Sequence, residues 1–326
     1  MSITAALQDV LGCVRPELER MNDELVGDLH PRTAEIQPLL EHVARYRGKQ
    51  LRPALVFLTG KMFGGPAEAH YTCAKVVELI HTATLVHDDI LDGATVRRRE
   101  PTINHLHGNE VPVLLGDFIY ALAFHMAVGL EDPTCARLFS DAVRTVCQGE
   151  ITQCLHRGDT TWDQERYYAV IREKTASLYG AACKVGAHYG GATTEQIDAL
   201  GSFGNHIGMA FQVIDDCLDL VGDEAVVGKS LGTDLDLGKI TLPLIHLLEH
   251  SGDRRPELEA LLGGAERSGS LRELRAEFDV DSSVAYALAQ AAGWVRRGVV
   301  ALETLPAGPS RDALAAVADY VLRRNL

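Results

Sequence analysis

Two groups of aspartates are the residues with the clearest capacity for chemistry in this sequence. The first runs from Asp88 to Asp92 and the second from Asp215 to Asp219, and both have the pattern D-D-x-x-D. At 3.6 residues per helical turn, the first and last aspartate of each group lie on one face of a helix. Like charges at this spacing destabilise a helix by about 0.2–0.5 kcal/mol per pair, so we expect a bound cation to relieve them.

Carboxylate oxygens suit hard cations such as Mg²⁺, which typically takes one or two carboxylates and keeps water and substrate phosphates as its other ligands. One acidic group at a helix end is equally well explained as a solvated surface. Two matching groups, each ending an apolar segment, favour a shared ligand instead. We therefore predict that the two groups face each other and hold a phosphate-rich ligand through bridging Mg²⁺ ions.

Cationic residues follow or precede turns near both groups, as a phosphate-rich ligand requires. Arginine binds phosphate oxygens bidentately, and lysine acts as a point charge. Each cation alone is typical of a solvated surface, and the combination carries the prediction. His81 lies seven residues before Asp88 and therefore on the same helical face. The cations are Lys49, Arg52, Arg97, Arg98, Lys229 and Lys239.

The segments that carry these residues are predicted to be helices. Strand signals are nearly absent, whereas Thr193-Thr194-Glu195-Gln196 is a capping box that begins a helix. The Gly- and Pro-rich breaks between segments are neither long nor polar enough for an interdomain linker. The sequence therefore predicts one large all-α domain spanning residues 1–326. Segments with apolar residues at three- and four-residue spacing are 67–91, 110–130, 134–156, 164–190, 194–221 and 284–304.

The composition is that of a globular protein, with 326 residues, 46% of them hydrophobic and 23% charged. The net charge of −14 argues against a nucleic-acid-binding face. No run approaches the roughly 18 consecutive apolar residues of a membrane span, and no basic region precedes a signal-like segment. The seven cysteines show no C-x-x-C pairing and indicate reduced thiols in a cytoplasmic protein.

The sequence resembles the trans-isoprenyl diphosphate synthases of the polyprenyl synthetase family. The resemblance covers residues from about 40 to 245, in order and with matching spacing. Two D-D-x-x-D groups together with the element GKQLRP form a highly specific combination. The matching stretches are 48–53 (GKQLRP), 81–99 (HTATLVHDDILDGATVRRR), 116–124 (GDFIYALAF), 174–176 (KTA), 211–219 (FQVIDDCLD) and the two Gly-Lys pairs at 228–229 and 238–239.

The resemblance implies an isoprenoid synthase type I fold, a helical bundle around a central apolar cavity with the aspartates at its mouth. It implies roughly three Mg²⁺ ions per active site and a homodimer. Asp88 and Asp92 would bind Mg²⁺ on the allylic diphosphate, and Asp215 would anchor a further Mg²⁺. The other aspartates of the two groups, which would act directly or through metal-bound waters, are Asp89, Asp216 and Asp219.

The same resemblance implies two substrate sites. Isopentenyl diphosphate would be bound by Lys49, Arg52, His81 and Arg98. The allylic diphosphate would be bound by Arg97, Lys174, Lys229 and Lys239. Thr175 and Gln212 would contact the reacting carbons. The chain has Arg98-Arg99-Glu100 where the family usually has Arg-Arg-Gly; spacing from Asp92 favours Arg97 and Arg98, with Arg99 as the alternative.

The implied reaction ionises the allylic diphosphate, and the double bond of isopentenyl diphosphate attacks the resulting cation. The released diphosphate removes the proton, so no side chain is needed as base. An apolar cavity keeps water from the cation.

Product length depends on the helix before the first aspartate group, which would form one wall of the tube for the growing chain. Ala83 and Thr84 are small where a ring would block the tube, and Ile80 lies on the same wall. Phe139 or Met126 would form its floor. With about one isoprene unit per helical turn, and with GDFIYALAF most like octaprenyl-type synthases, we predict a product of about 30–45 carbons.

Three other functions remain to be weighed. A geranylgeranyl diphosphate synthase is the first alternative. A class I terpene cyclase would need neither GKQLRP nor an isopentenyl diphosphate site, and a non-catalytic partner subunit would have lost an aspartate group. We expect no membrane span, although a peripheral membrane contact could serve product release.

Overall fold

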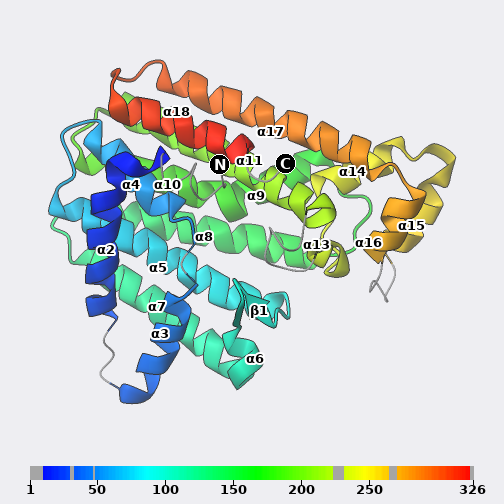
Figure 1. Ribbon diagram of the computed structural model, residues 1–326, viewed down its shortest axis with the longest axis horizontal. Helices are drawn as coiled ribbons and strands as arrows, with labels where there is room; N and C mark the ends of the chain where they lie inside the picture. The colour runs from blue at the N-terminus through cyan, green and yellow to red at the C-terminus, as the bar shows by residue number, and fades with distance from the viewer. Residues whose placement is uncertain (1–9, 30–32, 47, 223–230, 264–269, 324–326) are drawn as a thin grey trace.

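The computed structural model describes residues 10–29, 33–46, 48–222, 231–263 and 270–323. Almost all of the described chain is helical, and the long helices lie side by side in two layers (Figure 1). The predicted all-α class is therefore confirmed. A single two-stranded hairpin is the exception among the described residues.

The first half of the chain contains η1 Gly12–Val14, α2 Arg15–Asp28, η2 Ala34–Ile36, α3 Gln37–Ala44, α4 Leu51–Lys61, α5 Glu68–Leu91, β1 Val96–Arg97, β2 Glu100–Pro101, α6 Ile103–His107, α7 Glu110–Val128 and α8 Thr134–Leu155. The second half contains α9 Gln164–Ile171, the π-helix η3 Arg172–Ala176, α10 Ser177–Tyr189, α11 Thr194–Val221, α13 Thr233–Asp236, α14 Leu242–His250, η4 Gly252–Arg254, α15 Arg255–Gly263, α16 Ser270–Glu277, α17 Val280–Leu302 and α18 Pro309–Leu322.

The predicted helical segments agree with the structure to within a few residues. The capping box at Thr193 is also confirmed, because the Thr193 hydroxyl accepts from the Gln196 N–H at 3.4 Å and the Gln196 amide oxygen accepts from the Thr193 N–H at 2.9 Å. The largest departure inside a segment is the π-helix, which interrupts 164–190 where an unbroken α-helix was predicted.

The β1–β2 hairpin was not predicted, because its turn lacks glycine and asparagine. Arg98 and Arg99 occupy the two central positions with φ of 52° and 70°, a left-handed conformation that two-residue hairpin turns require. Val96 pairs with Pro101 and Arg97 with Glu100. The hairpin thus holds two arginines of the predicted site on a short, strained turn directly after α5.

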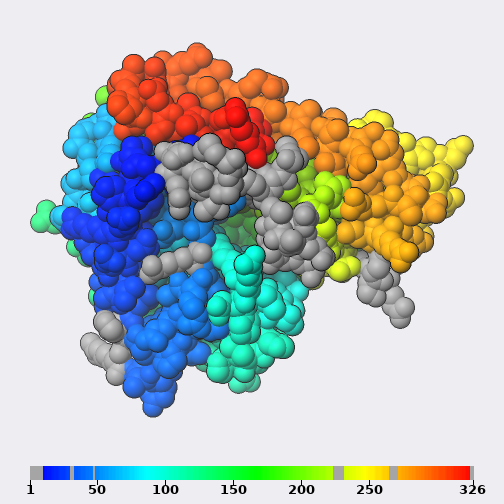
Figure 2. Space-filling view, in the orientation of Figure 1, coloured from blue at the N-terminus to red at the C-terminus, as the bar shows by residue number. Residues whose placement is uncertain are grey.

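The core lies between the two layers. Helix α11 packs along α10 and α17, and α5 packs along α4 and α7 (Figure 1). The α10 and α11 backbones approach so closely that a Cβ on Gly204 would lie 2.5 Å from the Tyr179 carbonyl oxygen, which accounts for glycine there. In the space-filling view, the front face is hollowed beside the cyan hairpin, with green central residues at the bottom (Figure 2).

One histidine is enclosed where α4, α5 and α10 meet. The His70 Nδ1 atom accepts a hydrogen bond from the Ala67 N–H at 3.0 Å, and its Nε2–H donates to the Gly186 carbonyl at 3.0 Å. These two bonds require the neutral Nε2–H tautomer. Burial lowers the pKa of His70, so the ring stays neutral in the folded protein.

Candidate active site

The first aspartate group spans the C-terminal end of α5, with Asp88 and Asp92 half-buried. Burial raises the pKa of Asp88 to about 6, although the nearby Lys174 ammonium lowers it. Asp89 points the other way and is only 1% exposed. Its Oδ1 accepts from the Arg97 guanidinium at 2.7 Å. The helix therefore directs Asp88 and Asp92 to one face and Asp89 into the protein, as the i, i+4 spacing predicts.

The second group lies near the C-terminal end of α11, with Asp215 half-buried and Asp216 and Asp219 fully buried. The Tyr167 hydroxyl donates to one oxygen of Asp216 at 2.6 Å, and the Gln212 amide donates to the other at 2.7 Å. Burial, together with the nearby Asp234 charge, raises the pKa of Asp216 to about 8.

Asp219 has a structural contact of its own. It accepts hydrogen bonds from the Thr233 hydroxyl at 2.9 Å and the Asp234 N–H at 3.0 Å, which ties the start of α13 to α11. Like Asp89 and Asp216, it is engaged by protein partners. Of the six aspartates, the partly exposed ones are Asp88, Asp92 and Asp215.

These surroundings bear on the expected Mg²⁺ ligands. Within the described ranges, no three His, Cys, Asp or Glu side chains form a ready-made metal cluster. Hard divalent ions would then need further oxygens from water and a phosphate-bearing ligand, which is how Mg²⁺ is usually held. The carboxylates at Asp88, Asp92 and Asp215 fit that role, whereas those at Asp89 and Asp219 already have protein donors.

Two lysines lie against the first aspartate group. The Lys239 ammonium lies 3.1 Å from an Asp92 oxygen and 3.1 Å from an Asp234 oxygen. Burial lowers its pKa, but these two carboxylates outweigh burial and raise the pKa of Lys239 above its usual range. Lys174 pairs with Glu150 and donates to the Gln153 amide oxygen at 3.1 Å. Lys229, the remaining predicted lysine, lies outside the described residues.

The π-helix η3 carries the predicted residues Lys174 and Thr175. The Thr175 hydroxyl donates to the Gln212 amide oxygen at 2.7 Å, and Gln212 in turn donates to Asp216. Because both ends of the amide are used, the Gln212 side chain is fixed in orientation. This chain of hydrogen bonds connects the π turn to the second aspartate group.

A second cationic cluster gathers beside the hairpin. A Cβ added to Gly48 would lie 2.3 Å from the Arg98 Nη2 atom, so a larger residue at position 48 would displace this guanidinium. Burial, and the positive charges of Arg52 and Arg98, lower the pKa of His81 well below its usual range. The Arg52 guanidinium stacks over the Tyr179 ring at 4.4 Å. The predicted Arg52, His81 and Arg98 are thus neighbours.

The other predicted basic residues near this cluster are placed differently. Lys49 is exposed, with its ammonium 5.5 Å from the centre of the Tyr320 ring. Arg97 pairs with Asp89, with the Arg97 Nε and Asp89 Oδ1 atoms 2.7 Å apart. Arg99 is exposed at the tip of the turn. The arrangement favours Arg98 over Arg99 as the member that faces Arg52 and His81.

Sequence reasoning missed four residues that contact the site: Glu150, Gln153, Arg157 and Tyr167. Glu150 and Gln153 are three apart on α8, a spacing that places both on one face. That spacing alone does not single them out among other polar pairs. Tyr167 lies seven residues before Lys174, but the intervening π turn changes which face it occupies.

The residues predicted to line the product tube are closely packed in this structure. Ile80, Ala83 and Phe139 have essentially no surface accessible to water, and Thr84 is half-buried with its hydroxyl donating to the His81 carbonyl at 2.7 Å. Nearer the mouth, a cavity of about 10 Å³, room for one water, is lined by Gln153, His156, Trp162, Tyr167, Val170, Lys239 and Ile240.

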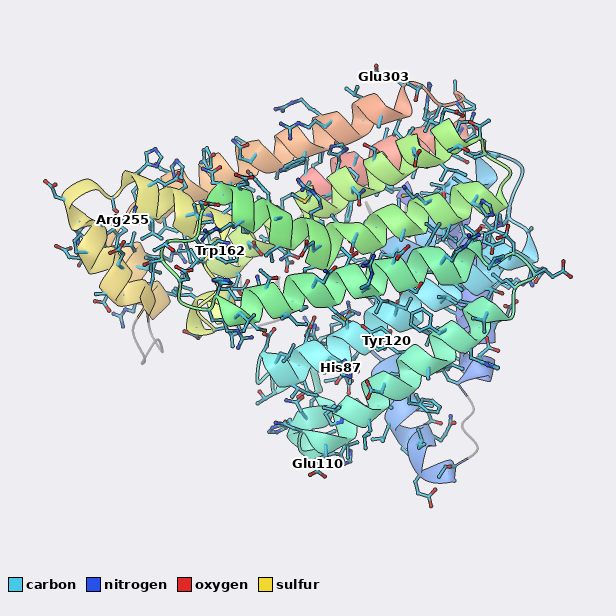
Figure 3. The ribbon with its side chains drawn as sticks, turned by 180° about the vertical axis from the view of Figure 1, so that it is seen from behind. His87, Glu110, Tyr120, Trp162, Arg255 and Glu303 are labelled. Atoms are coloured by element: carbon cyan, nitrogen blue, oxygen red, sulfur yellow. The ribbon has the colours of Figure 1, made fainter. Side chains whose placement is uncertain are left out.

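Helix α7 bears on the expectation that no helix spans a membrane. It is 19 residues long with a mean hydropathy of 1.7, so by length and composition it could cross a membrane. The helix contains no unbroken apolar run of that length, because Glu110 is its first residue and Asp117 lies within it. A third of the 18-residue apolar stretch of α7 is buried in the protein. Figure 3 shows Tyr120 of α7 directed toward His87 of α5. Such a helix is weak support for a span, because core helices meet the same criterion.

An all-α bundle with two aspartate-bearing helix ends defines a class of protein, and comparisons with known proteins identify it. The polyprenyl synthetase family model matches residues 33–278. An octaprenyl diphosphate synthase from Haemophilus influenzae is 33% identical over 98% of this chain and 98% of its own. A short chain isoprenyl diphosphate synthase from Methanothermobacter thermautotrophicus is 33% identical over 98% of this chain and all of its own.

The fold agrees with the same class. A crystal structure of polyprenyl synthase from Caulobacter crescentus, complexed with calcium and isoprenyl diphosphate, superposes with a TM-score of 0.93 at 31% identity, covering 98% of both chains. The chain belongs to the polyprenyl synthetase family. It is a polyprenyl diphosphate synthase, a transferase of prenyl groups.

Proposed function

We propose that this enzyme condenses isopentenyl diphosphate with an allylic diphosphate and extends an all-trans chain to about 30–45 carbons. The observation that carries the proposal is the presence of two separate cationic groups, one of which lies beside the carboxylates of the first aspartate group. Lys174 and Lys239 lie beside Asp88 and Asp92, whereas Arg52 and Arg98 gather around His81. A reaction between two diphosphate substrates would require two such cationic groups, one for each diphosphate.

The donor set suits Mg²⁺, of which we propose roughly three ions per site. Asp88, Asp92 and Asp215 would hold them. The raised pKa of Asp88 reflects a carboxylate poorly stabilised by its surroundings, and a divalent cation would remedy that. Bound Mg²⁺ would neutralise charge on the leaving diphosphate.

The protein's own residues then divide the work. Lys174 and Lys239 would orient the allylic diphosphate, and Thr175 and Gln212 would face the reacting carbons. Arg52 and Arg98 would hold isopentenyl diphosphate by its charge. His81 stays neutral at physiological pH because burial and two arginines lower its pKa, so it would donate a hydrogen bond without adding charge. Close packing around the reacting carbons would exclude water.

Long products are supported by the small residues Ala83 and Thr84 and by the octaprenyl synthase relative. The short chain isoprenyl diphosphate synthase has the same sequence identity to this chain, 33%, as the octaprenyl diphosphate synthase. Geranylgeranyl diphosphate is therefore the alternative product. The test is incubation of the pure chain with isopentenyl diphosphate, allylic primers of several lengths and Mg²⁺, followed by chain-length analysis. Products of about 30–45 carbons support the proposal. Arrest at 20 carbons would establish the alternative, and no turnover would indicate a non-catalytic subunit.

We also propose that the chain is one domain over residues 1–326 and forms a homodimer in the cytoplasm. All seven cysteines are free thiols, as the reducing cytoplasm favours. Large apolar side chains are exposed along α7 and α8, including Leu114 at 68% and Leu155 at 78%. A second copy of the chain would cover such a face. A peripheral membrane contact through the same face would instead appear as binding to lipid vesicles.

A further inference from the structure

We propose that Arg157 is an additional ligand of the allylic diphosphate, held on Asp92 until that substrate arrives. The proposal rests on the proposed function, because it takes Asp92 as a Mg²⁺ ligand. Arg157 lies two residues beyond the end of α8, and the D-D-x-x-D pattern gave no indication of it. No assigned role in the reaction includes this residue.

The position of the Arg157 guanidinium is the first observation. Its Nη2 atom lies 3.6 Å from the Asp92 Oδ1 atom and 3.3 Å from the Leu91 carbonyl oxygen at the C-terminal end of α5. The Nε atom on the same edge is buried and has no hydrogen-bond partner. A buried N–H without an acceptor costs about 1–3 kcal/mol. One edge of the guanidinium is therefore only partly used, and an oxyanion with two oxygens would complete it.

The loop that carries Arg157 is well anchored. The Gly158 N–H donates to the Gly238 carbonyl at 2.7 Å, next to Lys239 in the sequence. The Thr160 carbonyl accepts from Arg255 at 3.4 Å, and the His156 and Trp162 rings pack 4.9 Å apart. Figure 3 shows Trp162 and Arg255 at the same end of the bundle. The loop thus fixes Arg157 beside Lys239 rather than leaving it as a surface charge.

Both cations contact the same oxygen of Asp92. Lys239 approaches Oδ1 to 3.1 Å and Arg157 approaches it to 3.6 Å. Mg²⁺ would need that carboxylate at about 2.0–2.1 Å, and a dication would repel both side chains. A diphosphate that arrives with Mg²⁺ supplies new acceptors for the displaced cations. Arg157 would then transfer from Asp92 to the diphosphate.

This exchange predicts effects of opposite sign in one variant. In Arg157→Ala, Mg²⁺ alone should bind as tightly as before or more tightly, because one competitor for Asp92 is gone. Inorganic diphosphate with saturating Mg²⁺ should bind about tenfold more weakly. The KM for the allylic substrate should rise by a similar factor, with the KM for isopentenyl diphosphate unchanged. Arg157→Lys should be intermediate, because lysine provides no bidentate edge.

Isothermal titration of the full chain with MgCl₂, and then with inorganic diphosphate at fixed MgCl₂, measures both affinities. Arg166→Ala is the matched control, since it removes an exposed arginine of α9 that pairs only with Asp163 among the ion pairs described. Unchanged diphosphate affinity in Arg157→Ala would overturn the proposal. So would a parallel loss of Mg²⁺ and diphosphate affinity, which would mean that Arg157 merely positions Asp92. If Arg157→Ala fails to fold, the same comparison is made with Arg157→Lys.

Asp92→Asn separates this inference from the proposed function. If the Asp92→Asn variant binds Mg²⁺ and diphosphate normally, Asp92 is not a metal ligand and the proposed site itself fails. If Asp92→Asn loses binding while Arg157→Ala does not, only the role of Arg157 is rejected.

Discussion

The aspartates of the two D-D-x-x-D groups differ in what surrounds them. Asp88 is half-buried with a pKa raised by burial, whereas Asp219 is fully buried and accepts two hydrogen bonds from the start of α13. A carboxylate with a raised pKa destabilises the folded state at neutral pH, because the unfolded chain holds the charged form more easily. The two donors that Asp219 accepts from instead tie the start of α13 to α11. We therefore expect the same residue type to serve ligand binding at Asp88 and folding at Asp219.

Alanine substitutions should separate these roles. Asp88→Ala and Asp215→Ala should abolish turnover and leave the melting temperature of the metal-free protein unchanged or higher, because strained like charges are removed. Asp219→Ala should lower stability by about 1–3 kcal/mol, because two buried donors lose their acceptor. Steady-state rates and thermal melts measure both effects. Near-normal activity of Asp88→Ala, or its unfolding without metal, would refute the metal assignment.

The two cationic clusters should be separable by substrate. Arg52→Ala and Arg98→Ala should raise the KM for isopentenyl diphosphate, whereas Lys174→Ala and Lys239→Ala should raise the KM for the allylic primer. A rise of about tenfold or more is expected for loss of one charge-assisted contact. Binding curves for each substrate, measured separately, decide the matter. A reversed pattern would contradict the assignment of the two sites.

At the scale of elements, α5 carries both the proposed metal ligands Asp88 and Asp92 and the predicted wall of the product tube. Ala83 lies five residues before Asp88 and has no accessible surface. Ala83→Phe should shorten the product to roughly three or four isoprene units if chain growth opens a tube along this face. The reacting carbons would be unaffected, since the ring would lie about one turn away from the Mg²⁺ ligands.

Closed packing around Ala83 gives this experiment a clear competing outcome. If the residue faces a permanently filled core, the ring should cost about 1–3 kcal/mol by overpacking and leave product length unchanged. Product analysis and a thermal melt of the same preparation distinguish the two. Ala83→Ser is the matched control, because it changes polarity with little change in volume.

The junction of α4, α5 and α10 predicts a pH effect on stability. His70 is neutral in the folded protein because burial lowers its pKa, whereas an unfolded histidine titrates near 6.5. Below about pH 6.5 the unfolded chain binds a proton that the folded chain does not, so stability falls as pH falls, until the lowered folded pKa is reached. His70→Gln should flatten the dependence of melting temperature on pH between about 5 and 7. An unchanged slope would exclude His70 as its source.

The sequence predicted those elements whose formation depends on local pattern. Periodicity located α5, α8 and α11, and the i, i+4 rule placed Asp88 and Asp92 on one face. Features that depend on contacts between distant segments were missed. The π turn at 172–176 and the hairpin of Arg98 and Arg99 have no distinctive composition. Partners such as Glu150 and Arg157 meet the site only because α8 and its following loop pack beside α5 and Lys239.

At the scale of the whole molecule, α7 and α8 expose apolar side chains that a second copy of the chain would bury in the proposed homodimer. Leu114→Glu and Leu155→Glu together should convert a homodimer into a monomer, because burying two carboxylates against apolar side chains is unfavourable. Sedimentation velocity across a range of protein concentrations measures the change. Val26→Glu, at an exposed position on α2, is the control. A monomeric parent chain, or a variant that remains dimeric, would place the interface elsewhere or remove it.

The left-handed turn at Arg98 and Arg99 also affects how the second substrate is received. Residues other than glycine cost roughly 1–2 kcal/mol each in that conformation, and the hairpin has only two residues in each strand. That cost is offset by contacts outside the turn, such as the ion pair of Arg97 with Asp89 and the hydrogen bond from the Thr102 hydroxyl to the Ala94 carbonyl. An anion held by Arg98 would offset more of the cost, because it would bind the observed conformation of the turn in preference to others. Isopentenyl diphosphate would then complete the wall of its own binding site, and part of its binding energy would appear as ordering of the hairpin rather than as affinity.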